Sequence, residues 1–283
     1  GIGSGALANA NTGDDNTGVG GYSAGTSITT GSYNTAIGSY AMGETSANAI
    51  TGNSSTAVGY KAGFELQGAA AENTLVGVLC GDALTTGSYN TALGMQALST
   101  ETGGSYNVAV GIGALELLNT NSAAYNTAMG YNAAQLTTTG EQNTIIGGLA
   151  GDALTTGSYN VALGYSALSG EDTGGKNTAL GAYTLQNLNY AGDGNNTAIG
   201  YNAGNAITTA RYATLVGTYA GDAITVGTDN TAVGYGALSS EDAHGGNTAI
   251  GMHTLNAQNA GANAYSTALG WEAGRNISTG VNN

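Results

Sequence analysis

Short apolar stretches and polar turns alternate along the chain with a period near 17 residues. Each period opens on the string Asn-Thr-Ala-(Ile/Leu/Val)-Gly, which recurs with small variations in 15 copies whose spacing is nearly constant. We call each period a coil and number the first residue of the string as position 1. A second, longer period groups the coils in fours, since Gly81-Asp82-Ala83-Leu84 returns as Gly151-Asp152-Ala153-Leu154. Internal repetition of this kind is typical of solenoid proteins.

The five residues of the string predict a short β-strand, because they combine β-branched Thr, Val and Ile and end at Gly. A coil of 17 residues is too short for a β-α unit, but it fits a strand, a tight turn, a second strand and a closing turn. Stacked coils would place parallel strands about 4.8 Å apart. The sequence therefore predicts an all-β parallel β-roll, or β-solenoid, of about 16 coils. We expect one array over residues 1–283, with blocks near 1–70, 71–140, 141–210 and 211–283, cut from a longer fibre chain.

Two positions of the coil are expected to fix its backbone. Position 5 is Gly in all 15 copies, which predicts a positive φ or a very close approach of another chain. Position 1 is mostly Asn, and stacked amide side chains can form a hydrogen-bonded ladder. Representatives of these two columns are Asn34, Asn90, Asn160 and Asn230, with Gly38, Gly94, Gly164 and Gly234.

The two faces of the strand carry different residues. Alternation places positions 2 and 4 on one face and positions 1 and 3 on the other. Both faces include apolar residues, since position 4 is aliphatic and position 3 is mostly Ala, and a strand of this kind is usually buried on both sides. We expect the face of positions 1 and 3, where Leu75, Ile145 and Leu215 recur once in every four coils, to pack against other copies of the chain, most simply around a threefold axis. The alternative is that Ala at position 3 is a tolerated surface residue.

Tyr supplies 17 of the 19 aromatic residues and recurs at fixed places in the coil. One column directly precedes position 1 and another occupies position 6. Stacked rings that cover the edge of the roll explain both columns. The alternative is a glycan-binding stripe, because the faces of Tyr and Trp rings stack on sugars. The candidate glycan contacts are Tyr131, Tyr165, Tyr201, Tyr235 and Trp271.

Charge is scarce and acidic, with 18 Asp and Glu against four Lys and Arg and a net charge of −14. Four basic residues cannot neutralise a run of phosphates, which argues against a nucleic-acid partner. A single Cys excludes a disulfide framework, and the apolar stretches are too short to insert into a membrane. Position 8 is a small slot, so Cys80 there has a plain packing role.

The acidic residues offer one metal hypothesis. Loop carboxylates together with backbone carbonyls can bind Ca²⁺. The alternative is that these residues form solvated acidic loops that keep the chain soluble. The calcium candidates are Asp82, Asp152, Asp222, Glu171, Asp172, Glu241 and Asp242.

Catalytic chemistry is not indicated by the remaining residues. His244 and His253 lack the spacing of a metal site. The Ser residues have no repeated His or Lys partner, and no Gly-rich string continues into the Lys-Ser/Thr of a phosphate loop. A flat column of Thr can bind ice, but position 2 shares its face with aliphatic position 4, which favours an inward column. We expect a non-catalytic protein without a resident cofactor.

The segments Asn-Thr-Ala-Ile-Gly-Tyr-Asn-Ala-Gly at 196–204 and Asn-Thr-Ala-Val-Gly-Tyr-Gly-Ala-Leu at 230–238 resemble the head repeats of trimeric autotransporter adhesins. They are also similar to repeats of phage tail fibres and bacterial surface proteins that end in an endosialidase-type chaperone domain. The resemblance implies a trimeric, left-handed parallel β-roll used for attachment. The coils of this chain are longer than the adhesin type and are grouped in fours.

Periodicity and resemblance together favour a structural fibre, an extracellular, cell-surface or virion attachment shaft formed by a homotrimer. Two alternatives stay open at this point. One is a carbohydrate-binding adhesin head that contacts a cell-surface glycan through its Tyr columns, and the other is a self-assembling surface filament.

Overall fold

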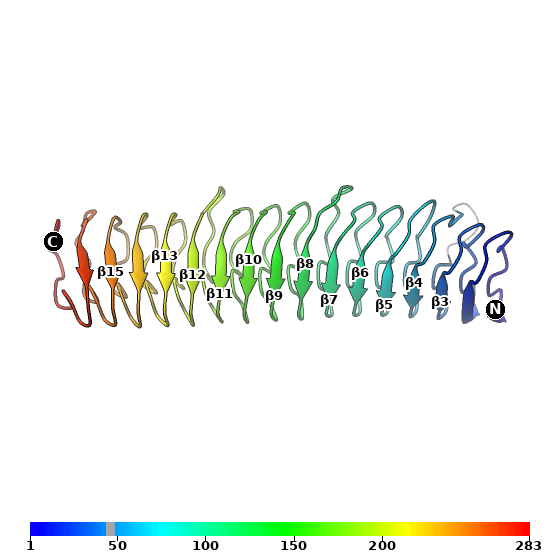
Figure 1. Cartoon of the computed structure of the whole chain (residues 1–283), viewed down its shortest axis with the longest axis horizontal. Coiled ribbons are helices and arrows are strands. Elements are labelled where there is room, and N and C mark those ends of the chain that lie inside the picture. Colours follow the sequence, from blue (N-terminus) through cyan, green and yellow to red (C-terminus); the bar gives the residue numbers. More distant parts are fainter. Residues whose placement is uncertain (44–48) are drawn as a thin grey trace. The chain divides into compact units, whose positions relative to one another are not determined.

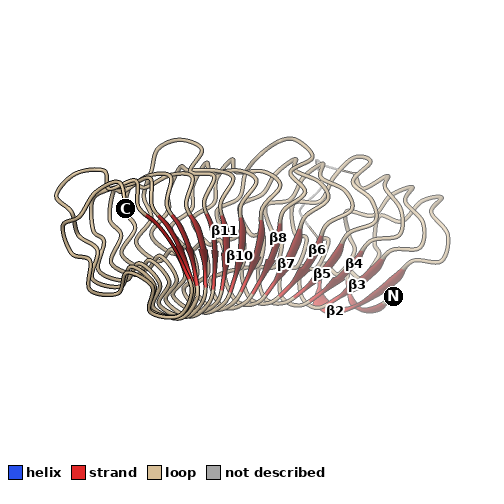
Figure 2. Ribbon diagram, turned by 60° about the vertical axis from the view of Figure 1, so that its left-hand side comes forward, coloured by secondary structure: helices blue, strands red, loops and turns tan. Residues whose placement is uncertain are grey.

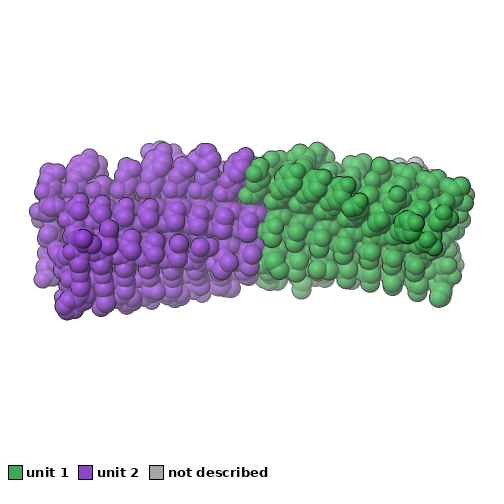
Figure 3. Space-filling model, in the orientation of Figure 1, with its two compact units in different colours: residues 1–142 green, residues 143–283 purple. Residues whose placement is uncertain are grey.

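The computed structural model confirms an all-β parallel β-solenoid with one short strand in each coil. It describes residues 1–43 and 49–283, which form two compact units, Gly1–Gln142 and Asn143–Asn283 (Figure 3). The boundary coincides with the start of a coil, at the junction of the second and third four-coil blocks. No helix long and apolar enough to cross a membrane occurs in the described ranges.

Each unit holds eight strands that follow one another in chain order (Figure 1). The first unit contains β1 (Ile2–Ser4), β2 (Thr17–Tyr22), β3 (Thr35–Ile37), β4 (Thr56–Val58), β5 (Thr74–Val76), β6 (Thr91–Leu93), β7 (Val108–Val110) and β8 (Thr127–Met129). The second unit contains β9 (Thr144–Ile146), β10 (Val161–Leu163), β11 (Thr178–Leu180), β12 (Thr197–Ile199), β13 (Thr214–Val216), β14 (Thr231–Val233), β15 (Thr248–Ile250) and β16 (Thr267–Leu269).

The strands pair in register, so that each coil position lies beside the same position of the next coil. In β11 and β12, for example, Thr178 pairs with Thr197 and Leu180 with Ile199. Most strands cover only positions 2 to 4, which is shorter than the five residues expected from the sequence. In-register pairing arranges each strand position into a column along its unit.

The predicted second strand of the coil is wrong. Outside the strands already named, Figure 2 shows turns and loops in the part of each coil that the structure describes. The cause is local, because alternate residues after the strand adopt a left-handed backbone, as do Gln96 at φ 57° and Leu98 at φ 55°. Backbone hydrogen bonds still join neighbouring coils there, as from the Leu98 N–H to the Ala114 carbonyl at 3.0 Å.

The two faces of the strand are reversed relative to the sequence-based expectation. Positions 1 and 3 lie inside the coil, and Leu75, Ile145 and Leu215 are buried in the core of their own chain. In β10, Ala162 is fully buried whereas Leu163 beside it is 50% exposed. Position 3 therefore cannot form the expected contact with other copies, and the face of positions 2 and 4 is the outer one.

The interior is filled by complementary side-chain sizes. Coils with Ala at position 3 commonly place Leu at position 9, as Ala162 and Leu168 do. Where position 3 is large, position 9 is Gly, and a Cβ on Gly221 would lie 2.8 Å from Cδ2 of Leu215. An apolar column at position 12 is also buried, for example at Leu84, Leu154 and Ile224.

Position 5 has the predicted positive φ, but the close approach there is made by the next coil of the same chain and not by another chain. Fourteen of its 15 glycines, all except Gly20, have φ between +120° and +147°. A Cβ would also meet the next coil, since on Gly94 it would lie 2.4 Å from the carbonyl oxygen of Gly111. A Cβ added to Gly38 or to Gly164 would likewise lie 2.5 Å from the carbonyl oxygen of the position-5 glycine in the following coil.

The predicted Asn ladder at position 1 is confirmed, and it joins side chains to backbone. Asn90 Oδ1 accepts the N–H of Asn107 at 3.0 Å, and Asn90 Nδ2 donates to the carbonyl of Gly104 at 2.9 Å. Asn34 and Asn230 hold the following coil in the same way. Each Asn of the ladder thus binds the start of its strand to the start of the next strand and to the loop that leads into it.

Candidate functional site

The outer strand face carries a column of Thr at position 2 beside a column of aliphatic residues at position 4. It comprises positions 2 and 4 of β3 to β16, and we call it the strand face. Leu163 is 50% exposed and Ile199 is 38% exposed. Val108 and Val161 replace Thr in the first column. A regular sheet surface of this composition is apolar for one half of its width and hydroxyl-bearing for the other.

The size of the outer sheet surface is that of an interface. Three residues at about 3.3 Å and a strand spacing of about 4.8 Å give each strand about 50 Å² of outer surface. The 14 strands β3 to β16 thus offer about 700 Å² per chain, about 300 Å² in the unit Gly1–Gln142 and about 400 Å² in the unit Asn143–Asn283. A stable protein interface takes about 800 Å² from each partner, and exposed apolar patches of several hundred Å² mark interaction sites.

A second surface is a column of six aromatic rings in the unit Asn143–Asn283. Neighbouring rings pack edge to face, with centroids 5.2 to 5.9 Å apart and planes at 79° to 90°. We call this column the aromatic ladder. Its members are Tyr165, Tyr183, Tyr201, Tyr219, Tyr235 and His253.

The structure brings together three of the five glycan candidates and adds partners that the sequence did not reveal. Tyr165, Tyr201 and Tyr235 alternate in the ladder with rings from position 7, whereas Tyr131 and Trp271 lie outside it. A different arrangement holds Tyr89, Tyr106 and Tyr125, just before position 1, where the rings stack face to face at 4.9 and 5.0 Å. That trio fits the expectation of a stacked aromatic edge.

The acidic loops contain buried glutamates whose carboxylates accept hydrogen bonds from backbone N–H groups. Glu171 Oε1 accepts the N–H of Gly174 at 2.6 Å, and Oε2 accepts the N–H of Tyr190 in the next coil at 3.3 Å. Glu101, its counterpart in the preceding four-coil block, accepts the N–H groups of Gly104 and Thr120 in the same manner. These carboxylates close the loop and anchor it to the following coil.

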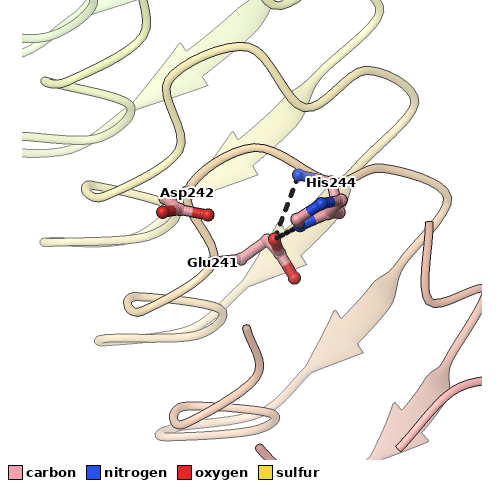
Figure 4. Close-up of side chains that lie close together, drawn as sticks. All are labelled: Glu241, Asp242 and His244. Carbon is pink, nitrogen blue, oxygen red and sulfur yellow. Dashed lines mark hydrogen bonds and ion pairs between the residues drawn. The ribbon is translucent and has the colours of Figure 1, made fainter. Parts of the chain in front are cut away.

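The third copy of this loop differs, because His244 enters it. Glu241 Oε1 accepts the His244 N–H at 3.0 Å and lies 3.1 Å from Nδ1 of the same residue, as the dashed lines of Figure 4 mark. One ligand atom each of Glu241, Asp242 and His244 lies within 4.8 Å of the others, the one such group among the described residues. Of the seven calcium candidates, the structure gathers only Glu241 and Asp242 in this way. The bonds to His244 give Glu241 the same loop-closing role as its two counterparts.

Burial acts on five of the acidic side chains in the same direction. Loss of hydration raises the pKa of each carboxyl above its ordinary value. The five are Asp82, Asp152, Glu171, Asp222 and Glu241. Oδ1 of Asp152 and of Asp222 is buried without a hydrogen-bond partner, so the charged form is poorly solvated at both positions.

These raised pKa values predict a protein that is more stable at acidic pH. A carboxyl whose pKa is higher in the folded state stabilises it fully below the unfolded pKa, about 4, and this contribution is lost as pH rises through the folded pKa. We expect the urea midpoint to fall between pH 4 and pH 8. Asp152→Asn and Asp222→Asn should each raise stability at pH 8 by less than about 1 kcal/mol, because both side chains are partly exposed and screened. A steeper pH dependence in the double variant would contradict this assignment.

Cys80 is a core residue, as its place in the sequence predicts. Its Sγ lies 3.2 Å from the carbonyl oxygen of Ala92, and burial raises the pKa of the thiol to about 12. A thiol with this pKa is protonated at neutral pH and therefore inert as a nucleophile.

Comparison with known proteins gives no further guide: no protein family, no curated protein and no solved structure matches this chain.

Proposed function

We propose that this chain is a structural fibre protein, an extracellular or virion attachment shaft, whose copies associate through the strand face, most simply as a homotrimer. The observation that carries the proposal is the aliphatic column at position 4, whose members are partly exposed or exposed in a single chain and which continues from coil to coil within each unit. Burial of such a column against other copies stabilises the assembly by removing apolar surface from water.

Repetition supports a mechanical role. Parallel backbone pairing, the Asn ladder and the position-5 glycines recur coil after coil in each unit. Energy that is distributed evenly along a repeat array gives stiffness and defined length. The loops between coils then supply the surface that is displayed.

The strand face fits a second copy of the chain better than an ice surface. The sequence argued against ice binding because the Thr column at position 2 was expected to point inward. In the structure this column lies on the outer face, so that argument no longer applies. Ice recognition, however, requires a flat and regular surface, whereas position 4 varies in size from Val110 to Met129 and Leu163. Side chains of unequal size can interdigitate with another protein surface.

The test is the mass of the assembly in solution. We expect sedimentation equilibrium of the full chain to give three times the 27.6 kDa chain mass. The double variant Leu163→Glu with Ile199→Glu should weaken association about a hundredfold, because two apolar side chains worth about 1.5 kcal/mol or more each are replaced by carboxylates. Val226→Glu is the matched control, since Val226 is 45% exposed but lies in a loop.

A monomeric wild-type chain would overturn the proposed assembly, as would equal weakening by the loop variant. A mass that rises continuously with concentration would favour the self-assembling filament. Circular dichroism of both variants shows whether they retain the fold.

A further inference from the structure

The aromatic ladder presents exposed rings at a regular pitch. In edge-to-face packing, the ring that offers its edge keeps its own faces free of that partner. The position-6 rings Tyr165, Tyr201 and Tyr235 are 44 to 50% exposed, whereas the position-7 rings between them are less exposed. Exposed rings therefore recur at every second coil, about 9.6 Å apart, or two strand spacings.

This pitch matches a linear polymer with a ring-sized repeat. Two pyranose residues of an extended β-1,4-linked polysaccharide span about the same distance as two strand spacings, about 9.6 Å. A chain laid along the ladder can thus place every second sugar on an exposed Tyr ring. From the first to the third exposed ring is four strand spacings, or about 19 Å, which an extended hexasaccharide covers.

The charge around the ladder favours a neutral ligand. Positions 6 and 7 of the six coils that form it hold no Lys, Arg, Asp or Glu. The chain as a whole carries −14, so a polyanionic glycan would be repelled. Hydrogen-bonding groups beside the rings are uncharged, namely the Tyr hydroxyls, Asn202 and Thr218.

The stacked Tyr trio of the other unit does not have these properties. In Tyr89, Tyr106 and Tyr125 the planes lie within 5° and 11° of parallel, and the middle ring has both faces covered by its neighbours. The trio therefore offers exposed Tyr without a repeated free face, which makes it a matched control for the ladder.

We propose that the aromatic ladder of residues 165–253 binds a neutral linear polysaccharide, which lies along the stack of coils with its sugars on Tyr165, Tyr201 and Tyr235. The inference rests on the proposed attachment role and adds the class of ligand. It is separable from self-association, because the ladder lies after the strand and shares no residue with the strand face.

The test is isothermal titration calorimetry of the full chain with four probes: cellohexaose, β-1,4-mannohexaose, β-1,4-xylohexaose and the acidic hexagalacturonate. We expect at least one neutral hexasaccharide to bind, and its disaccharide to bind at least about tenfold more weakly, because the disaccharide reaches a single exposed ring. The triple variant Tyr165→Ala, Tyr201→Ala, Tyr235→Ala should lose at least about tenfold in affinity. The control variant Tyr89→Ala, Tyr106→Ala, Tyr125→Ala should bind as the wild type does.

The proposal is overturned if no neutral hexasaccharide binds, if hexagalacturonate binds more tightly than the neutral probes, or if the two triple variants lose affinity equally. The strand-face variant Leu163→Glu with Ile199→Glu separates the two proposals. If the monomer of this variant still binds the glycan, the binding proposal is supported whether or not the wild type is a trimer. If the wild type is a trimer that binds none of the probes, the assembly proposal stands and the glycan-binding proposal is overturned.

Discussion

Gly147→Ala is expected to destabilise the protein by about 4 kcal/mol, whereas Gly148→Ala, one residue later, should change stability by less than about 0.5 kcal/mol. Gly147 has φ +137°, and a Cβ there would lie 2.4 Å from the carbonyl oxygen of Gly164. Backbone strain and a clash with a backbone that cannot move aside each cost about 1 to 3 kcal/mol. Gly148 has an ordinary φ, and its Cβ would lie 3.7 Å from the Tyr165 ring.

Urea unfolding of the full chain, followed by circular dichroism, measures both effects. The pair shares one coil and one chemical change, so differences in propensity largely cancel. Similar midpoints for the two variants would show that the coils do not approach each other as closely as the position-5 column requires. A third variant, Gly164→Ala, should repeat the loss, because its Cβ would lie 2.5 Å from the backbone of Gly181.

The positions that are fixed by backbone geometry, namely the Gly and Asn columns, were the part of this fold that the sequence predicted most directly. A glycine that recurs at one place in every coil, as Gly94 and Gly164 do, has few physical explanations, and the structure shows the predicted positive φ together with a close approach of the next coil. The Asn column was equally informative, because an amide is the side chain that can both accept from and donate to the next coil. Such positions depend on backbone geometry, which repeats with the sequence.

The inside and the outside of the strand could not be assigned in the same way. Ala162 is buried and Leu163 is exposed, the reverse of what side-chain hydrophobicity alone favours. The physical reason is the narrowness of the coil. Leu168 at position 9 of the same coil is fully buried, and the coils with a large residue at position 3 have Gly at position 9, so the interior beside the strand holds a large side chain at one of these two positions only. Side-chain size along one strand does not reveal what the rest of the coil contributes to the interior.

Three of the six members of the aromatic ladder, those at position 6, were identified from the sequence. Tyr183, Tyr219 and His253 were missed because they occupy position 7, and alternation along an extended strand would turn them away from position 6. Their backbone is left-handed, with φ of 57°, 58° and 54°, which brings them into contact with the position-6 rings. A search for aromatics at position 6 or 7 in consecutive coils would have found all six.

Asn160→Ala is expected to destabilise the protein by about 3 kcal/mol, since it leaves two buried backbone groups without their partner. Asn160 Oδ1 accepts the N–H of Asn177 at 3.0 Å, and its Nδ2 donates to the carbonyl of Gly174 at 2.9 Å. Asn160→Ser should lose less, because the hydroxyl of Ser55 at the same position accepts the N–H of Asn73 at 3.2 Å. The loss should therefore be smaller for the Ser substitution than for the Ala substitution.

The reverse change is available in the same chain, because position 1 is Ala at residue 213. The Ala213 N–H donates to Asn196 Oδ1 at 3.0 Å, so the ladder is intact before this residue. The methyl side chain of Ala213, however, cannot accept a hydrogen bond from the Asn230 N–H in the next coil. Ala213→Asn should restore that bond and raise stability by about 1 kcal/mol, the net worth of one buried hydrogen bond. Urea midpoints of the Asn160→Ala, Asn160→Ser and Ala213→Asn variants should therefore fall on both sides of the wild type. A loss of stability in the Ala213→Asn variant would contradict this prediction. It would show that neighbouring side chains fill the space that the amide needs, so that position 1 contributes packing at residue 213 and hydrogen bonding in the other coils.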